Sequence, residues 1–425
     1  MLKSLQKAFK VKEVRERLLY TFMMLIVIRI GSCLPIPGVD ASFLKEFFTN
    51  LQNSGMGFVN AITGGSFSNM SLFALSITPY ITSSIIMQLM TIAIPKLEEM
   101  QKEGEDGRKK IAEYTRYLTV ALALFQSSAM AIGFGKQGLL YEDAQNVWGY
   151  MTVIAAMTAG SALLMWIGER ITEKGVGNGI SIVLLINIVS SLPQDVLMLY
   201  ERFMAGKSVA VATVAAIIVL AVVVATVVFV LVLNGAERRI PVQYAKKVVG
   251  RKVYGGQSTF LPIKVTMSGV MPVIFASAIL SIPSTIRLFV GEPTGFWKGF
   301  FNAFSSTGWL YSVLYLLLIV VFAYFYMTIQ YNPIEMANNL RTNNGTIPGI
   351  RPGRPTAEFI SKILSKITLI GAIFLAFVAI LPILYSNLTG MYGLSMGGTS
   401  VIIMVGVALE TVKQIESQMM MRHYK

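Results

Sequence analysis

Residues 209–233 read VAVATVAAIIVLAVVVATVVFVLVL, twenty-five residues in a row without a charged side chain. A helix of about 20 apolar residues is long enough to cross the ~30 Å hydrocarbon layer of a bilayer. Because lipid offers the backbone no hydrogen-bond partners, such a segment must pair its own N–H and C=O groups and therefore forms a helix. The stretch predicts a transmembrane helix, and it indicates that the chain is a membrane protein.

Other apolar runs of similar length stand on either side of this stretch. Hydrophobic types make up 54% of the 425 residues and charged types 14%, whereas a soluble domain carries about 25% charged residues. The sequence therefore predicts an all-α polytopic membrane protein with ten transmembrane helices. We expect them near residues 18–36, 72–94, 116–134, 148–168, 180–199, 209–233, 265–289, 309–331, 367–386 and 399–416.

The distribution of Lys and Arg predicts the orientation of these spans. An even number of spans places both termini on one side, and 29 of the 36 Lys and Arg residues fall in the stretches on that side, against six on the other. Positive residues concentrate in cytoplasmic loops. Both termini are therefore expected in the cytoplasm, and the formal net charge of +14 reflects this bias.

A polar break at residues 201–208 divides the chain into two parts of five spans each. An odd number of spans makes the second part enter the membrane in the opposite orientation, which is the arithmetic of an inverted repeat. We therefore expect an N-terminal half at 1–200, an external hinge at 201–208 and a C-terminal half at 209–425. Three long cytoplasmic loops are expected at 95–115, 234–264 and 332–366.

Three features differ from ordinary lipid-facing segments. The second and seventh spans carry many hydroxyl groups and prolines, which is typical of helices that face protein or water. They form either helix–helix contacts or an aqueous path. Arg29 lies deep in the first span, where a structural role within the bundle is favoured over substrate or ion binding. The uncharged stretch 57–71, GFVNAITGGSFSNMS, either folds into a protein cavity or forms an exposed external loop.

The composition argues against an enzyme. Cys33 is the only cysteine and His423 the only histidine, so neither a Cys/His metal cluster nor a His-based triad can be built. We expect no cofactor. A secondary transporter with inverted repeats is the alternative function, but it would normally carry a coupling carboxylate inside a span. Here the acidic residues gather at span ends and in loops.

Several longer stretches carry more specific information. They include GGSFSNMSLFALSITPYITSSIIMQL at 64–89, YTRYLTVALALFQS at 114–127, GVGNGISI at 175–182, PGIRPG at 348–353 and GGTSVIIMV at 397–405. The segment 237–279, which begins ERRIPVQYAKK, belongs with them. In this order, and over nearly the whole chain, they resemble the bacterial members of the SecY family of protein-conducting channels.

The resemblance implies two halves around a central pore. A ring of aliphatic side chains closes the waist of the pore, a plug closes its outer side, and a lateral gate opens to lipid between spans 2 and 3 and spans 7 and 8. Leu184 departs from the isoleucine typical of its place in the ring, which conserves volume. Ala278 stands where a polar gate residue is common. The implied ring is Ile77, Ile81, Leu184, Ile274 and Ile403; the plug, within about 57–71, includes Asn60, Ile62, Gly64, Gly65, Phe67 and Asn69; the gate is Thr82, Gln88, Gln126, Ala278 and Ile282.

The basic cytoplasmic loops acquire a role from the same resemblance. By composition alone, their Lys and Arg side chains are expected to hold the loops near the anionic lipids of the cytoplasmic membrane surface. The resemblance implies docking of the SecA ATPase and the ribosome, with SecE and SecG as companion subunits and preproteins and signal sequences as substrates in the bacterial plasma membrane. The implied docking residues are Arg238, Arg239, Lys246, Lys247, Arg251, Arg351 and Arg354.

Overall fold

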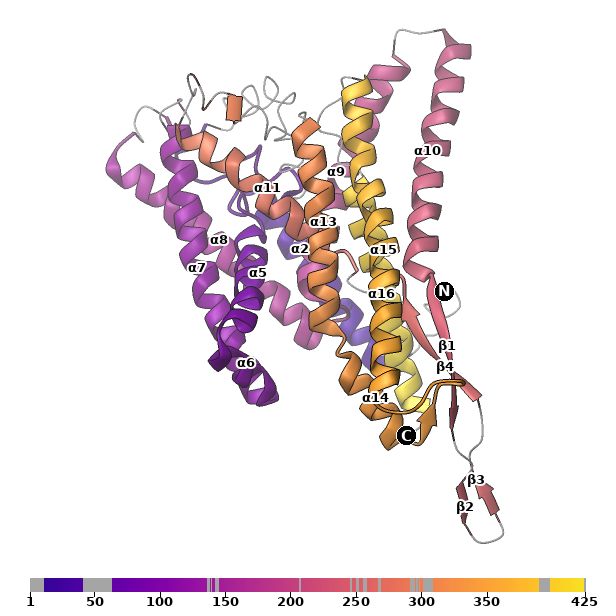
Figure 1. Cartoon of the computed structure of the whole chain (residues 1–425). Coiled ribbons are helices and arrows are strands. Elements are labelled where there is room, and N and C mark those ends of the chain that lie inside the picture. The colour runs from indigo at the N-terminus through magenta and orange to yellow at the C-terminus, as the bar shows by residue number, and fades with distance from the viewer. Residues whose placement is uncertain are drawn as a thin grey trace.

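The computed structural model describes residues 11–40, 63–135, 138, 140–141, 145–205, 208–244, 247–249, 252–254, 258–266, 269–290, 295, 297, 299–300, 309–389 and 398–423. Within them the chain is mostly helical, and the long helices run roughly side by side (Figure 1). The helices are α2 (Lys12–Cys33), α5 (Thr78–Ala93), α6 (Pro95–Lys102), α7 (Glu105–Gly135), α8 (Val147–Lys174), α9 (Gly179–Phe203), α10 (Val209–Gly235), α11 (Met271–Val290), α13 (Trp309–Gln330), α14 (Pro333–Thr342), α15 (Arg354–Thr389) and α16 (Gly398–His423).

Each predicted span coincides with one of the long helices in the described part of the chain. Six helices there are long and apolar enough to cross a membrane: α7, α8, α9, α10, α13 and α15. The pair α5 and α6 would make a seventh, although the two helices meet at an angle of 101°. Several helices outrun the predicted limits, and α15 begins at Arg354, well before residue 367.

The second span begins later than its hydropathy suggests. Helix α5 starts at Thr78, and residues 71–77 form buried turns in which Ser76 has a φ of 52°. Irregular backbone at membrane depth is tolerated where protein covers it. Here the covering helix is α8, because a Cβ built at Gly160 would lie 1.9 Å from the Leu72 carbonyl oxygen.

The prediction of an all-α protein is wrong for the loop at 234–264. Strand β1 (Glu237–Tyr244) pairs antiparallel with β4 (Ser258–Lys264) and with the short β5 (Gly345–Thr346), and β2 (Lys247–Val249) pairs with β3 (Lys252–Tyr254). Ile240 and Val242 are buried while their neighbours are exposed. This alternation with a period of two residues is typical of a strand. It contains no long apolar run, so hydropathy does not reveal it.

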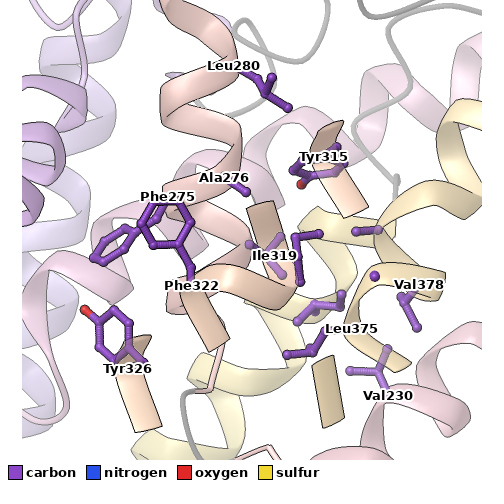
Figure 2. Close-up of a cluster of buried hydrophobic side chains, with 14 of the residues drawn as sticks. Val230, Phe275, Ala276, Leu280, Tyr315, Ile319, Phe322, Tyr326, Leu375 and Val378 are labelled. Carbon is purple, nitrogen blue, oxygen red and sulfur yellow. The ribbon is translucent and has the colours of Figure 1, made fainter. Parts of the chain in front are cut away.

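The helices pack in two groups. In the N-terminal half α5 packs on α7, α7 on α8, and α8 on α9; in the C-terminal half α11 packs on α13, α13 on α15, and α10 and α15 on α16. The largest buried cluster lies in the second group (Figure 2) and includes Phe275, Ile319 and Leu375. One residue of the first group, Ile85 of α5, is buried in the same cluster.

The two groups touch along two edges. At the edge called here the front seam, α5 and α7 contact α11, and α5 is also hydrogen-bonded to α13. At the edge called the rear seam, α9 contacts α10 and α16. The rear seam is reinforced at one end, where Val14 of α2, Val176 ahead of α9 and Ile415 of α16 share a small buried cluster. The start of the first long helix and the end of the last therefore lie at the same end of the bundle.

Candidate functional site

The five residues implied for the pore ring meet in one buried cluster. Ile77, Leu184 and Ile403 are almost fully buried, and Ile81 and Ile274 pack against them while half-buried themselves. Ile180, one turn before Leu184 on α9, belongs to the same cluster. The sequence separations are large, so only the packing of the helices brings these side chains together.

Four helices deliver these side chains. Ile77 is the N-cap residue of α5, and its carbonyl accepts the Ile81 N–H at 3.1 Å, so both face the cluster one turn apart. Leu184 comes from α9, Ile274 from α11 and Ile403 from α16. The site offers only hydrocarbon to whatever approaches it. It can exclude water and ions by dewetting, and it can yield to an apolar or extended chain without binding it specifically.

The described part of the implied plug is a compact run of turns at residues 63–70, and Asn60 and Ile62 lie outside the described residues. The Ser66 N–H donates to the Thr63 carbonyl, and the Met70 N–H donates to the Phe67 carbonyl. Phe67 packs edge-on against Phe134 of α7, with ring centroids 6.2 Å apart. Gly65 and Asn69 are half-buried and joined by a backbone hydrogen bond of 3.2 Å.

The start of this segment rests on the first and fifth spans. Arg29 of α2 donates through Nη1 to Ser190 Oγ of α9 at 2.9 Å and to the Gly64 carbonyl at 3.4 Å. Gly64 has a φ of 64°, and a Cβ there would lie 2.7 Å from Ser190 Oγ. The interpretation of Arg29 as a structural residue agrees with these contacts, since they join the first span to the fifth span and to the segment at 63–70.

The residues implied for the lateral gate line the front seam. Thr82 and Gln88 lie on α5, Gln126 on α7, and Ala278 and Ile282 on α11. Ala278 packs in the large cluster with Ile85 of α5, whereas Ile282 is 49% exposed and lies outside that cluster. The Thr82 hydroxyl bonds within its own helix, to the Thr78 carbonyl.

A hydrogen bond joins the two sides of the front seam. The Tyr326 hydroxyl of α13 donates to Gln88 Oε1 of α5 at 2.7 Å. Tyr326 stands at the border of the large cluster, with its ring centroid 5.1 Å from that of Phe275 and tilted by 50°, and its hydroxyl points out of the cluster (Figure 2). The Gln88 amide nitrogen donates to Ser84 at 3.4 Å, which steadies the acceptor.

The basic residues implied for docking divide into paired and unpaired charges. Arg239 forms an ion pair with Glu237, and Arg354 with Glu358. Arg238 and Arg351 are exposed and form no ion pair among the described residues. Lys247 begins β2, and Lys246 and Arg251 lie outside the described residues.

Arg351 is held in a well-anchored turn. Its carbonyl accepts the Thr356 hydroxyl at 2.8 Å, and the flanking Gly349 and Gly353 have φ values of 82° and 103°. Ile347, just before the turn, is buried in a cluster formed by β1, β4, α13 and α15. The turn is thereby fixed to the sheet that the sequence did not predict.

Comparison with known proteins shows to which family the chain belongs. The family model for SecY matches residues 71–412. The chain is 44% identical over 443 residues to the protein translocase subunit SecY of Streptomyces galbus, which covers all of this chain and 99% of that protein. It is 42% identical to the protein of the same name from Thermus thermophilus, covering 100% of this chain and 97% of the relative. The chain belongs to the SecY family.

Solved SecY-type structures share the fold. A structure described as a protein-conducting channel aligns with a TM-score of 0.62 over 95% of this chain and 92% of that one, at 17% identity. Canine Sec61 in a ribosome–channel complex aligns with a TM-score of 0.58, 16% identity and coverage of 95% and 92%. At such identities the likeness supports the fold alone. This SecY-family chain is a multi-pass membrane protein of the translocon type.

Sequence reasoning missed several residues around the SecY-type site. Tyr326 looks like one aromatic residue among many in an apolar span. Ser190 and Asn187 look like ordinary polar positions on α9, yet Asn187 is only 2% exposed and donates to Ser76 at 3.1 Å. A lone amide or hydroxyl in a span signals a polar contact, but the sequence does not name its partner.

Proposed function

We propose that this chain is the pore subunit of a protein translocase, which passes unfolded preproteins across the membrane and releases apolar helices sideways into lipid. The observation that carries the proposal is the aliphatic cluster built by four helices at the junction of the two helix groups. An aliphatic constriction excludes water and ions while it has no specificity for a passing chain. The names of the relatives, protein translocase subunit SecY, agree with it.

The finer architecture belongs to the same proposal. Ten spans form two inverted halves, 1–200 and 209–425, joined by an external hinge at 201–208 and arranged around a central pore in the bacterial plasma membrane. The matching of long helices to predicted spans supports the count, and the excess of Lys and Arg in one set of loops supports cytoplasmic termini. The chain acts as a channel without catalysis of its own.

The implied residues take their roles from this architecture. Ile77, Ile81, Leu184, Ile274 and Ile403 form the ring at the pore waist. The segment at 57–71 is the plug, supported by the contacts of its described part, 63–71, with α2, α7 and α9. The front seam is the lateral gate, supported by contacts of α5 and α7 with α11. The rear seam is the pivot.

The partners follow from the chemistry of the cytoplasmic surface. SecE and SecG are the proposed companion subunits, and the SecA ATPase and the ribosome are proposed to dock on the exposed basic residues, which also favour anionic lipid. Two ribosome-bound neighbours, canine Sec61 and yeast Ssh1, show that proteins of this fold occur in such complexes.

Reconstitution tests the proposed function directly. The chain, co-purified with SecE and SecG, is placed in liposomes with SecA, ATP and a preprotein that carries a signal sequence. We expect the preprotein to become protected from added protease only when ATP is present. Equal protection without ATP, or with liposomes that lack the chain, would contradict a role as the translocase pore.

The charge reversal Arg351→Glu is expected to cripple ATP-driven translocation. Arg351 is exposed, unpaired among the described residues and fixed in a bonded turn, so its guanidinium can engage an acidic or carbonyl acceptor of the motor. Loss of a charged hydrogen-bonded contact at an interface costs roughly 2–5 kcal/mol, which corresponds to a decrease in SecA affinity of at least about 30-fold. The measurements are translocation rate and SecA binding to vesicles.

The matched control is Lys362→Glu, which makes the same change of charge at an exposed position on α15. It should leave both quantities within the range of the parent protein. Arg351→Lys should lie between the parent and Arg351→Glu, because lysine keeps the charge but not the planar fork. If Arg351→Glu and Lys362→Glu behave alike, the turn at 348–354 is not the motor contact.

A further inference from the structure

A charged side chain inside the bundle holds the start of the plug. Arg29 is half-buried on α2, and among the described residues it forms no ion pair. Its hydrogen bonds to the Ser190 hydroxyl and the Gly64 carbonyl go to neutral acceptors. Hydrogen bonds that involve a charged group are about twice as strong as neutral ones. They are nevertheless cheaper to open than a buried ion pair, whose separation leaves two uncompensated charges.

Ser190 connects the plug to α9 through the same atoms. Its hydroxyl donates to the Asn187 carbonyl at 2.7 Å and lies 3.5 Å from the Gly64 carbonyl, while it accepts from Arg29. A Cβ at Gly64 would lie 3.0 Å from both Cα and O of Asn187. Only a glycine with positive φ allows the plug backbone to approach α9 this closely.

The backbone is strained both in the plug and in the turn that follows it. Met70 and Ser76 have φ values of 37° and 52°, which is unfavourable for residues that carry a Cβ. Ser66 Oγ on the plug and Asn187 Oδ1 on α9 are buried without a hydrogen-bond partner among the described residues. Both kinds of feature raise the free energy of the closed arrangement, so the closed plug needs a specific fastening.

We infer that Arg29 and Ser190 form a latch that fastens the plug at Gly64 in the closed channel and releases it when the helix groups part. The inference rests on the proposed function and goes beyond it by assigning positioning residues. The latch spans three elements, α2, α9 and the plug, so a shift of α9 relative to α2 breaks it. An arginine suits this role because its guanidinium stays charged and carries several N–H donors, and here Nη1 alone serves both acceptors.

The test measures plug position and sealing in Arg29→Met, Ser190→Ala and Arg29→Lys. All variants carry Cys33→Ser and a reporter cysteine, Asn69→Cys, on the half-buried plug residue. An impermeant maleimide is added on the external side, and labelling rate and resting ion conductance are recorded. Arg29→Met and Ser190→Ala should raise the labelling rate by about 10-fold or more, the population change expected when a hydrogen bond to a charged group is lost. They should also pass a preprotein with a defective signal sequence.

Arg29→Lys should show a smaller effect, because one donor and the charge remain. The matched control is Ser128→Ala on α7, whose hydroxyl donates to the Leu124 carbonyl of its own helix; its labelling rate should equal that of the parent. If Arg29→Met does not accumulate, Ser190→Ala and Arg29→Lys decide the question. Parent-like labelling in both would overturn the latch. Translocation of a normal preprotein by the parent is measured in parallel, so that failure of the proposed function is recognised separately.

Discussion

Linking α5 to α13 through Gln88→Cys and Tyr326→Cys is expected to stop translocation almost completely. The two side chains already meet across the front seam, with their oxygens 2.7 Å apart. Cysteines are shorter, so a bis-methanethiosulfonate reagent bridges the remaining gap. In the proposed lateral gate a signal sequence passes between these helices to reach lipid, and a covalent bridge forbids their separation. The measurement is protease protection of a preprotein in vesicles, in a Cys33→Ser background.

Reductant should restore translocation, because the bridge consists of disulfides. The matched control is Ser127→Cys with Thr158→Cys, at hydroxyls 2.9 Å apart on α7 and α8 within one helix group. The same reagent should bridge that pair without loss of translocation. The gate assignment fails if the bridged 88–326 pair translocates at the unbridged rate. The variant Tyr326→Phe removes only the hydrogen bond to Gln88, which is worth about 0.5–1.5 kcal/mol. It should raise the ratio of open to closed gates by roughly 2- to 10-fold.

The second large effect is expected at the pore waist. Replacing Ile274 and Ile403 together with glycine should raise resting ion conductance in planar bilayers several-fold. The two side chains come from α11 and α16 and close the aliphatic cluster against α5 and α9. Without them the constriction is wider and its backbone is exposed, so water fills it and ions follow.

The control for this effect is Ile402→Gly. Ile402 is the neighbour of Ile403 on α16 but is buried in the large cluster between α10, α11 and α15. It carries the same loss of helix propensity, about 1 kcal/mol, and should lower stability without raising conductance. Ile403→Leu, which conserves volume, should conduct like the parent. Equal conductance in the double variant and in Ile402→Gly would mean that the ring is located elsewhere.

The sequence predicted the long helices because hydropathy is a local property of about twenty residues. The five residues that the family resemblance implied for the ring lie in one buried cluster, and their role at a pore waist stays a prediction. The late start of α5 was missed, because Ser76 and Leu72 owe their turn conformation to contact with α8 and α9. No local pattern contains that information.

The remaining differences have distinct causes. The strand at 237–244 could have been predicted, since Ile240 and Val242 alternate with exposed residues, but the charges of Glu237, Arg238 and Arg239 at its start looked like those of a loop. The hydrogen-bond partners of Arg29 and Gln88 could not be predicted from the sequence. Arg29 reaches residues 35 and 161 positions away, and Gln88 meets a residue 238 positions away. Such contacts are set by helix packing, which the sequence of one chain does not display.

The rear seam has a mechanical consequence. Because α9 is packed against both α10 and α16, and the ends of α2 and α16 share a cluster beside it, sliding or tilting of one helix group past the other would disrupt buried contacts. Rotation about an axis along the seam leaves most of them in place, which is hinge motion in its simplest form. We therefore expect the two helix groups to move mainly along this one coordinate. If the waist and the gate lie where we propose, a perturbation that widens one is expected to widen the other.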